Sequence, residues 1–206
     1  MHAGEFDRKT CAAHMTRRRV LKTGFAGTAG LAVAGLRGCS ETAFDSVAAR
    51  EPGVIDRRLA ELSVTLPEPT EAVATYAPFR VVGDMVYVAG QGPAFDAGTK
   101  VFGKLGADLT IEEGVNAARL TGLSVLAQAK AACGGDLDRI VQWVRLTGYV
   151  NSADDFVDQP KVINGASDLL VEIFGEKGLH ARAAVGVNAL PFNIAVEIEA
   201  SFQIRS

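Results

Sequence analysis

The chain has 206 residues, of which 48% are hydrophobic and 22% charged; this composition is typical of a folded globular protein and excludes a wholly disordered one. Up to Cys39 there are seven basic and two acidic side chains, whereas the rest has 14 basic and 22 acidic ones, a formal charge of −8. This acidic part of the chain, called the body below, has no stripe of basic residues that could bind phosphates. We therefore do not expect nucleic acid as a partner. The length fits one domain with additional segments.

Cysteine and histidine are scarce after Cys39. The body of the chain holds one cysteine, Cys133, and one histidine, His180. One cysteine cannot form an intramolecular disulfide, and the pair cannot provide the ligand set of a structural zinc site. We therefore expect neither a metal nor another cofactor.

The N-terminal segment has the layout of an export signal. Residues 16–22 read TRRRVLK, and an apolar stretch rich in Gly and Ala follows. Such a stretch is typical of a secretory signal and is too short to span a bilayer. The motif resembles the twin-arginine signal, with Arg17 and Arg18 as the pair, and predicts a periplasmic or extracellular protein. The alternative is a basic, disordered N-terminus. Met15 precedes the motif, so residues 1–14 are possibly not translated.

Two further interpretations concern residues 36–69. The string LRGCS at 36–40 resembles a lipoprotein box with Cys39 as the lipidated residue, although Arg37 departs from the usual small residue. This lipid is the only membrane attachment that we expect, and its alternative is release after cleavage. Residues 1–39 are therefore assigned to the export signal and residues 40–69 to a linker. A short amphipathic helix is possible at 54–64.

The compact domain is expected at residues 70–206, and its first half predicts a hairpin and a helix. Residues 76–95 contain two β-rich runs separated by Gly83-Asp84, a strong hairpin signal. Residues 102–109 are a short strand candidate broken by glycine. Thr110 and Glu113 form a capping box before a helix that the CGG string at 133–135 ends.

The second half predicts a strand, a helix and two further strands. The strand covers 139–150, and the helix lies within 152–175, beginning at Ser152 or Asp154 and ending at Gly175. The last two strands, at 181–190 and 194–204, alternate apolar and polar residues. The LPFN string joins them, and the face assignments below assume that they pair through it as a hairpin. This order predicts an α+β fold, with both helices on one face of a single sheet.

Several of these strings resemble the Rid family (reactive intermediate deaminase, or YjgF-like). They are YAPFRVVGDMVYVAGQGP, AKAACGGDLDRIVQWVRLTGYVNSADDF and ARAAVGVNALPFNIAVEIEA, and the resemblance extends over roughly residues 70–206. The resemblance implies a chorismate-mutase-like fold and a homotrimer with pockets between subunits. It also implies hydrolysis of an enamine or imine, such as 2-aminoacrylate, to a 2-keto acid and ammonia, without a metal or cofactor.

The same resemblance implies four site residues. Arg182 matches the family's carboxylate-binding arginine and Glu197 its water-positioning glutamate, while Tyr76 and Asn164 match two further pocket positions. An Arg fork suits a carboxylate, and a carboxylate side chain can orient water. If the last two strands pair, Arg182 and Glu197 share a face, with Gly186 leaving room for a ligand. Taken singly, these residues are more often surface side chains.

Two positions depart from the family pattern. Ala184 stands where many deaminating members have Cys, and Ala89 where they have Ser. His180 is a candidate replacement as a titrating group, with an exposed loop histidine as the alternative. The leading function is therefore an exported imine or enamine deaminase, and the alternative is a non-catalytic small-carboxylate binding protein. RNA cleavage, a third reading, is disfavoured by the acidic body.

Overall fold

The computed structural model describes residues 51–72, 74–94 and 98–205. It has one sheet, in the order β1-β2-β5-β3-β4. The strands are β1 (Phe79–Val82), β2 (Met85–Gln91), β3 (Ile140–Asn151), β4 (Ala181–Val187) and β5 (Val196–Ile204). Neighbours are antiparallel except β3 and β4, which run parallel.

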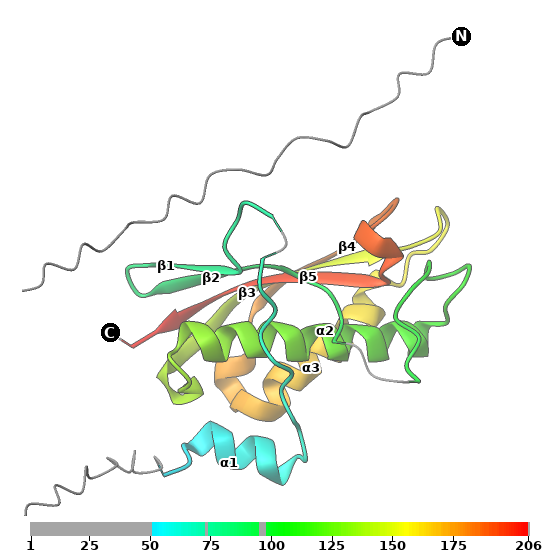
Figure 1. Cartoon of the computed structure of the whole chain (residues 1–206). Coiled ribbons are helices and arrows are strands. Elements are labelled where there is room, and N and C mark those ends of the chain that lie inside the picture. The colour runs from blue at the N-terminus through cyan, green and yellow to red at the C-terminus, as the bar shows by residue number, and fades with distance from the viewer. Residues whose placement is uncertain (1–50, 73, 95–97, 206) are drawn as a thin grey trace, which may run out of the picture. The chain divides into compact units, whose positions relative to one another are not determined.

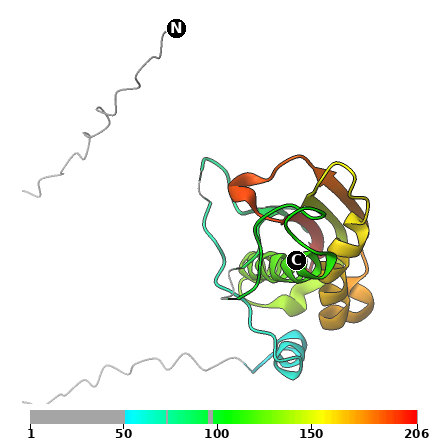
Figure 2. The same ribbon diagram turned by 90° about the vertical axis from the view of Figure 1, so that its right-hand side faces the viewer.

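Two long helices cover one face of this sheet. They are α2 (Ile111–Ala132) and α3 (Gln159–Phe174), and both lie below the sheet in Figure 1 and on the same side of it in Figure 2. The α+β fold with two helices on one face is therefore confirmed. The opposite face, called the open face below, carries neither helix.

Local signals placed the first hairpin and the start of α2 correctly. Val82 pairs with Met85 across Gly83, which has φ of 62°. The Thr110 hydroxyl accepts from the Glu113 N–H, and the Glu113 carboxylate accepts from the Thr110 N–H at 2.9 Å. The capping box satisfies two amides that the first helical turn leaves without partners.

Two predicted boundaries were wrong. Residues 102–109 form a loop that touches other segments through isolated bridges, at Phe102 and Leu105, and not a strand. The helix α3 begins at Gln159 and not at Ser152 or Asp154. Pro160, which has no backbone N–H to lose, then lies in its first turn.

The predicted pairing of the last two strands was also wrong. β4 pairs with β3 alone, and β5 lies between β2 and β3. The LPFN segment forms a short 3-10 turn, η3 (Pro191–Asn193), in which Phe192 and Asn193 have positive φ. This turn carries the chain across β3 instead of folding it back onto β4.

The core lies between the sheet and the two helices. Alternate residues of β5 from Val196 to Ile204 are buried there, as their apolar pattern predicted. Trp143 of β3 packs against Phe202 and, edge to face, against Phe174, with ring centroids 4.9 and 5.7 Å away. Aromatic packing of this kind fixes how α3 sits on the sheet, and hence where its polar side chains lie.

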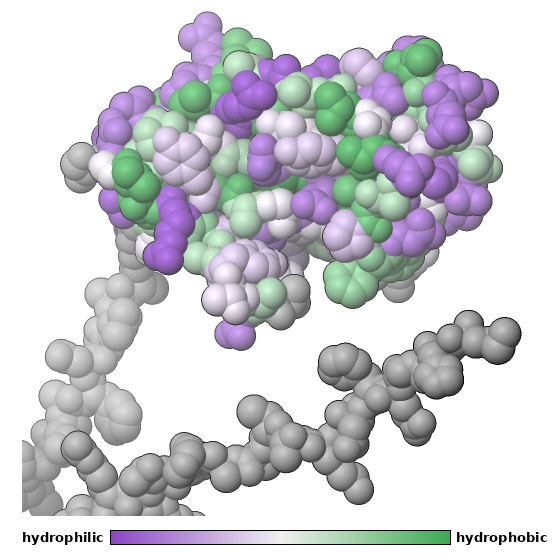
Figure 3. Space-filling view, turned by 90° about the horizontal axis from the view of Figure 1, so that it is seen from above, coloured by the Kyte–Doolittle hydropathy of each residue, from purple (hydrophilic) through white to green (hydrophobic). Residues whose placement is uncertain are grey.

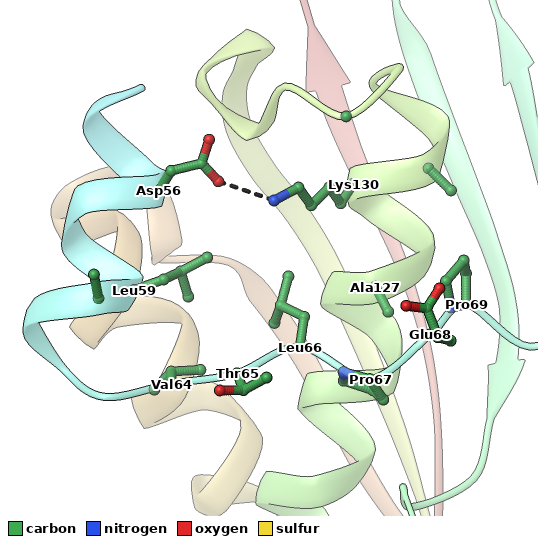
Figure 4. A pocket seen from close by; sticks show the side chains of 13 residues that line it. Asp56, Leu59, Val64, Thr65, Leu66, Pro67, Glu68, Pro69, Ala127 and Lys130 are labelled. Atoms are coloured by element: carbon green, nitrogen blue, oxygen red, sulfur yellow. Dashed lines mark hydrogen bonds and ion pairs between the residues drawn. The ribbon is translucent and has the colours of Figure 1, made fainter. Parts of the chain in front are cut away.

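The predicted amphipathic helix in the linker region exists as α1 (Val54–Glu61). Its Leu59 is buried in the core, and its first amides, of Val54 and Ile55, donate to the Asp138 carboxylate at 2.7 and 2.9 Å. An ion pair of 2.9 Å joins Asp56 to Lys130 of α2 (Figure 4). The chain before residue 70 therefore contributes to the same packed body.

The export interpretation stays a prediction, because Arg17, Arg18 and Cys39 lie outside the described residues. Within the described part, no helix has the length and apolar character needed to cross a membrane.

Candidate functional site

Arg182 lies on the helix-covered side of β4, at the edge of the sheet. It is in register with Leu146 of β3, and Gly186 is in register with Val150; both β3 residues are buried under the helices. Residues in register point to the same face. The Arg182 side chain consequently runs beside α3, and it stays exposed because β4 is an edge strand.

Three groups of α3 hold the Arg182 guanidinium. Its Nη1 donates to Asn164 Oδ1 at 2.8 Å and to Ser167 Oγ at 3.1 Å, and its Nη2 donates to the Pro160 carbonyl at 3.4 Å. The structure therefore brings together two of the predicted residues, Arg182 and Asn164.

A second layer of contacts supports this arginine. The Nδ1 of His180 lies 2.7 Å from the Gly178 carbonyl, so Nδ1 carries the proton and Nε2 is an acceptor. Ser167 lies 3.2 Å from that Nε2 and donates to it while accepting from Arg182. Burial, and then the Arg182 charge, lower the pKa of His180, which favours this neutral tautomer. His180 thus braces Arg182 through Ser167.

The arrangement leaves one edge of the arginine available. A guanidinium has five N–H donors, and three of them bind α3. The other two, on Nε and Nη2, have no partner among the described residues. They form the side-on fork that matches the two oxygens of a carboxylate.

Glu197 lies on the other side of the sheet. Its neighbours Val196 and Ile198 are buried under the helices, so the Glu197 side chain points to the open face. The prediction that Arg182 and Glu197 share a face was wrong, because it depended on pairing β4 with β5. Within one chain the sheet itself separates the two side chains.

A β-bulge holds Glu197 close to β2. The register of β2 against β5 shifts between Val88 and Gln91, and a Cβ on Gly90 would lie 2.1 Å from Glu197 Oε1. Gln91 is buried and donates to the carbonyls of Ala89 and Gly90 at 3.0 and 3.2 Å. Bulges near sites often re-aim a side chain. The Gly-Gln string thus has a physical reason: glycine makes room and glutamine fixes the bulge.

The Glu197 carboxylate is half-buried and has no hydrogen bond or ion pair within the described ranges. Burial, and then the nearby Glu199 charge, raise its pKa. Glu199 itself accepts from the Tyr149 hydroxyl at 3.3 Å. A carboxylate with a raised pKa and no described partner is a candidate for proton transfer.

The fourth predicted residue, Tyr76, is separated from Arg182 by the width of the sheet. Tyr76 is exposed and lies three residues before β1, at the sheet edge opposite β4. The carbonyl of Pro78, two residues further on, accepts from Ala89, next to the bulge. The structure therefore separates two half-sites: Arg182 with Asn164, and Glu197, with Tyr76 on the side of the sheet that carries Glu197's neighbour β2.

The open face has the character of a surface that can be covered. Exposed apolar side chains on it alternate with polar ones, as Figure 3 shows for this side of the molecule; they include Val82, Tyr87 and Val185. Val185 is in register with Tyr149 of β3 and, through it, with Glu197, whereas Val82 and Tyr87 lie further along the sheet. Their exposure is a typical mark of an interaction surface.

Other candidate features of the described chain carry no such chemistry. A hollow of about 650 Å³ lies between α1, α2 and residues 64–69 and is lined mainly by apolar groups (Figure 4). Burial raises the pKa of Cys133 to about 11, so this thiol is unreactive at neutral pH. No group of three potential metal ligands was found among the described residues.

Residues 56–199 match the family described as "YjgF/chorismate_mutase-like, putative endoribonuclease". The chain belongs to this YjgF/chorismate mutase-like family. Protein TCP17 of Trypanosoma cruzi is 43% identical over 155 residues, which are 75% of this chain and 96% of that protein.

Two solved structures of family proteins are also similar. Atu1372 of Agrobacterium tumefaciens, a protein of unknown function, is 45% identical with a TM-score of 0.68, covering 74% of this chain and 93% of its own. A Shewanella oneidensis protein described as "a putative endoribonuclease" is 38% identical with a TM-score of 0.69, covering 73% and 99%. The YjgF-like resemblance inferred from the sequence is thus confirmed.

Two residues that support Arg182 were not predicted in that role from the sequence: Ser167 and His180. Ser167 lies three residues after Asn164, which on a helix places both on one side, facing Arg182. That spacing was the available signal. His180 was considered only as a titrating group, whereas the structure makes it a support for Arg182.

We expect Glu197→Gln to stabilise the fold at neutral pH. A raised pKa means that the folded state binds the Glu197 proton more tightly than the unfolded state. The stability from that proton is present below the ordinary pKa near 4.5 and is lost as pH rises through the folded pKa. Glutamine is neutral throughout, so the advantage of the variant should grow above pH 4.5.

Thermal unfolding of both proteins between pH 4 and 8 measures this advantage. Glu71→Gln, at an exposed position, is the matched control and should change nothing. A Glu197→Gln protein less stable than wild type at pH 7 would contradict the environment described for this carboxylate.

Proposed function

We propose that the protein binds a small 2-imino carboxylate through Arg182 and hydrolyses it to the 2-keto acid and ammonia. The observation that carries this proposal is the braced guanidinium, whose free Nε–Nη2 edge matches a carboxylate. Three contacts to α3 fix its orientation before a ligand arrives, which lowers the entropic cost of binding.

The proposed site forms between two copies of the chain. Arg182 and Glu197 point to opposite faces, so one chain cannot bring both to one small ligand. A neighbouring copy that covers the open face can bring its own Arg182 edge over Glu197. The homotrimer implied by the family resemblance provides three such interfaces by rotation.

The chemistry requires only water and a proton carrier. Glu197 accepts a proton from water as the water oxygen bonds to the imine carbon, and it passes this proton to the imine nitrogen to give a neutral carbinolamine. Glu197 then accepts the proton of the carbinolamine hydroxyl and delivers it to the nitrogen, so that the C=O bond forms as the C–N bond breaks and ammonia leaves. The raised pKa of Glu197 supports both halves of this transfer.

A second candidate is a small-carboxylate binding protein without turnover. The alanines at 89 and 184 favour it, because they place methyl groups where a hydroxyl and a thiol could contact a ligand. The family description includes the term endoribonuclease. The net acidic body does not favour RNA cleavage.

Ammonia release separates these functions. Amino-acid oxidase acting on alanine generates the imine of pyruvate in the assay, and the protein should speed its conversion beyond the spontaneous rate. If the protein binds pyruvate but does not speed ammonia release, its function is binding and not deamination. If it neither binds pyruvate nor speeds ammonia release, and instead cleaves an RNA substrate, the proposal is overturned.

A further inference from the structure

We infer that a second, polar cavity beside Arg182 receives the substrate's side chain and selects an amide or hydroxyl group over an apolar or anionic one. This inference rests on the proposed function, because it assumes that Arg182 holds the carboxylate. The cavity has a volume of about 260 Å³ and lies at the ends of β3 and β4, next to the start of α3.

The cavity and Arg182 share one face of β4. Every second residue of a strand faces the same side, so Arg182, Ala184 and Gly186 share one face of β4. Only the methyl group of Ala184 lies between Arg182 and Gly186. Gln159 lines the cavity, and the next residue, Pro160, accepts from the Arg182 guanidinium. A ligand bound to the arginine fork can therefore extend toward the cavity.

A hydroxyl without a described partner lines this cavity. Ser152 is 6% exposed as a residue, and its Oγ has no hydrogen bond in the described part of the chain. Gln159 Nε2 donates to the Phe156 carbonyl at 2.6 Å, while Gln159 Oε1 has no described partner. Ser152 and Gln159 together offer a donor and acceptors to a ligand.

Gly186 keeps the cavity open. A Cβ at this position would lie 2.6 Å from Gln159 Nε2 and 2.7 Å from Ser152 Oγ. Both distances are shorter than a carbon can approach a nitrogen or oxygen without displacing it. The absence of a side chain at 186 thus exposes both polar groups to the cavity.

The charges around the cavity disfavour an anionic group. Asp154 lines it, and no basic residue does. Lys104, which contacts two residues of the cavity wall, has its ammonium engaged by Asn151 Oδ1 and by the carbonyls of Ser152 and Asn188. A second carboxylate would meet Asp154 without a counter-ion, whereas a neutral amide can donate to it.

Three 2-keto acids with side chains of nearly equal shape test this selection: 2-ketosuccinamate, 4-methyl-2-oxopentanoate and oxaloacetate. Pyruvate, with only a methyl group, reports on the Arg182 site alone. By calorimetry, 2-ketosuccinamate should bind the wild-type protein about tenfold more tightly than the other two side-chain ligands, from one or two additional hydrogen bonds.

Gly186→Val should remove the preference for the amide while leaving pyruvate affinity unchanged, since valine fills the cavity and suits a strand. Ser152→Ala should reduce the preference about three- to tenfold. Equal wild-type binding of the three isosteres, or a Gly186→Val protein that keeps the amide preference, would overturn the inference. Retained binding of every ligand by Arg182→Ala would instead overturn the proposed function.

Discussion

Arg182→Ala is expected to weaken pyruvate binding by about ten- to a hundredfold, because a charged hydrogen-bond partner contributes about 1.5–3 kcal/mol. The fold should persist. Arg182 is exposed on an edge strand, and water can replace it at Asn164, Ser167 and the Pro160 carbonyl. Calorimetry measures the affinity, and thermal unfolding measures the fold.

Arg182→Lys should restore little of this affinity. A lysine ammonium is a point charge that cannot contact Asn164, Ser167 and both oxygens of a carboxylate from one fixed position. Arg80→Ala, on the open face and the opposite edge strand, is the matched control for loss of an exposed arginine. Wild-type affinity in Arg182→Ala would remove the central residue of the proposed site.

Local features of the fold could be predicted because nearby residues determine them. The turn at Gly83 needs only a residue that tolerates positive φ, and the capping box needs only Thr110 and Glu113. The alternation from Val196 to Ile204 likewise identified the buried face of β5 before its neighbours were known.

The partner of β4 was missed because strand order depends on contacts distant in sequence. A short loop favours a hairpin, and this preference suggested pairing β4 with β5. The order strand, helix, strand over β3, α3 and β4 is also a βαβ unit, which predicts parallel neighbours. The parallel pairing formed, and it moved Arg182 to the face opposite Glu197.

The parallel pairing of β4 with β3 changes the predicted site more than the wrong start of α3 does. Arg182 and Asn164 could be predicted as a pair from family positions, and the structure brings them within 2.8 Å. Ser167, His180 and Gly90 act through three-dimensional contacts that no local pattern encodes. The proposed union of the two half-sites needs a second copy, which the sequence indicated only through the family resemblance.

Mixing two inactive variants should therefore restore activity. In Arg182→Ala the chain keeps Glu197, and in Glu197→Gln it keeps Arg182, so neither homotrimer has a complete site. If each site takes Arg182 from one chain and Glu197 from the next, random mixing in equal amounts makes about one quarter of the interfaces complete. Imine hydrolysis should then reach about one quarter of the wild-type rate.

Co-expression with two different affinity tags, followed by sequential purification on both, isolates the mixed assemblies; in a mixed trimer one interface of three is complete, so these should reach about one third of the wild-type rate. Their mass measures the number of chains, and a chain carrying both substitutions, mixed with either single variant, should restore nothing. Mixed assemblies that contain both chains yet hydrolyse no more imine than the single variants would show that the two half-sites do not meet between copies. The separation of Arg182 and Glu197 by the sheet predicts the opposite result.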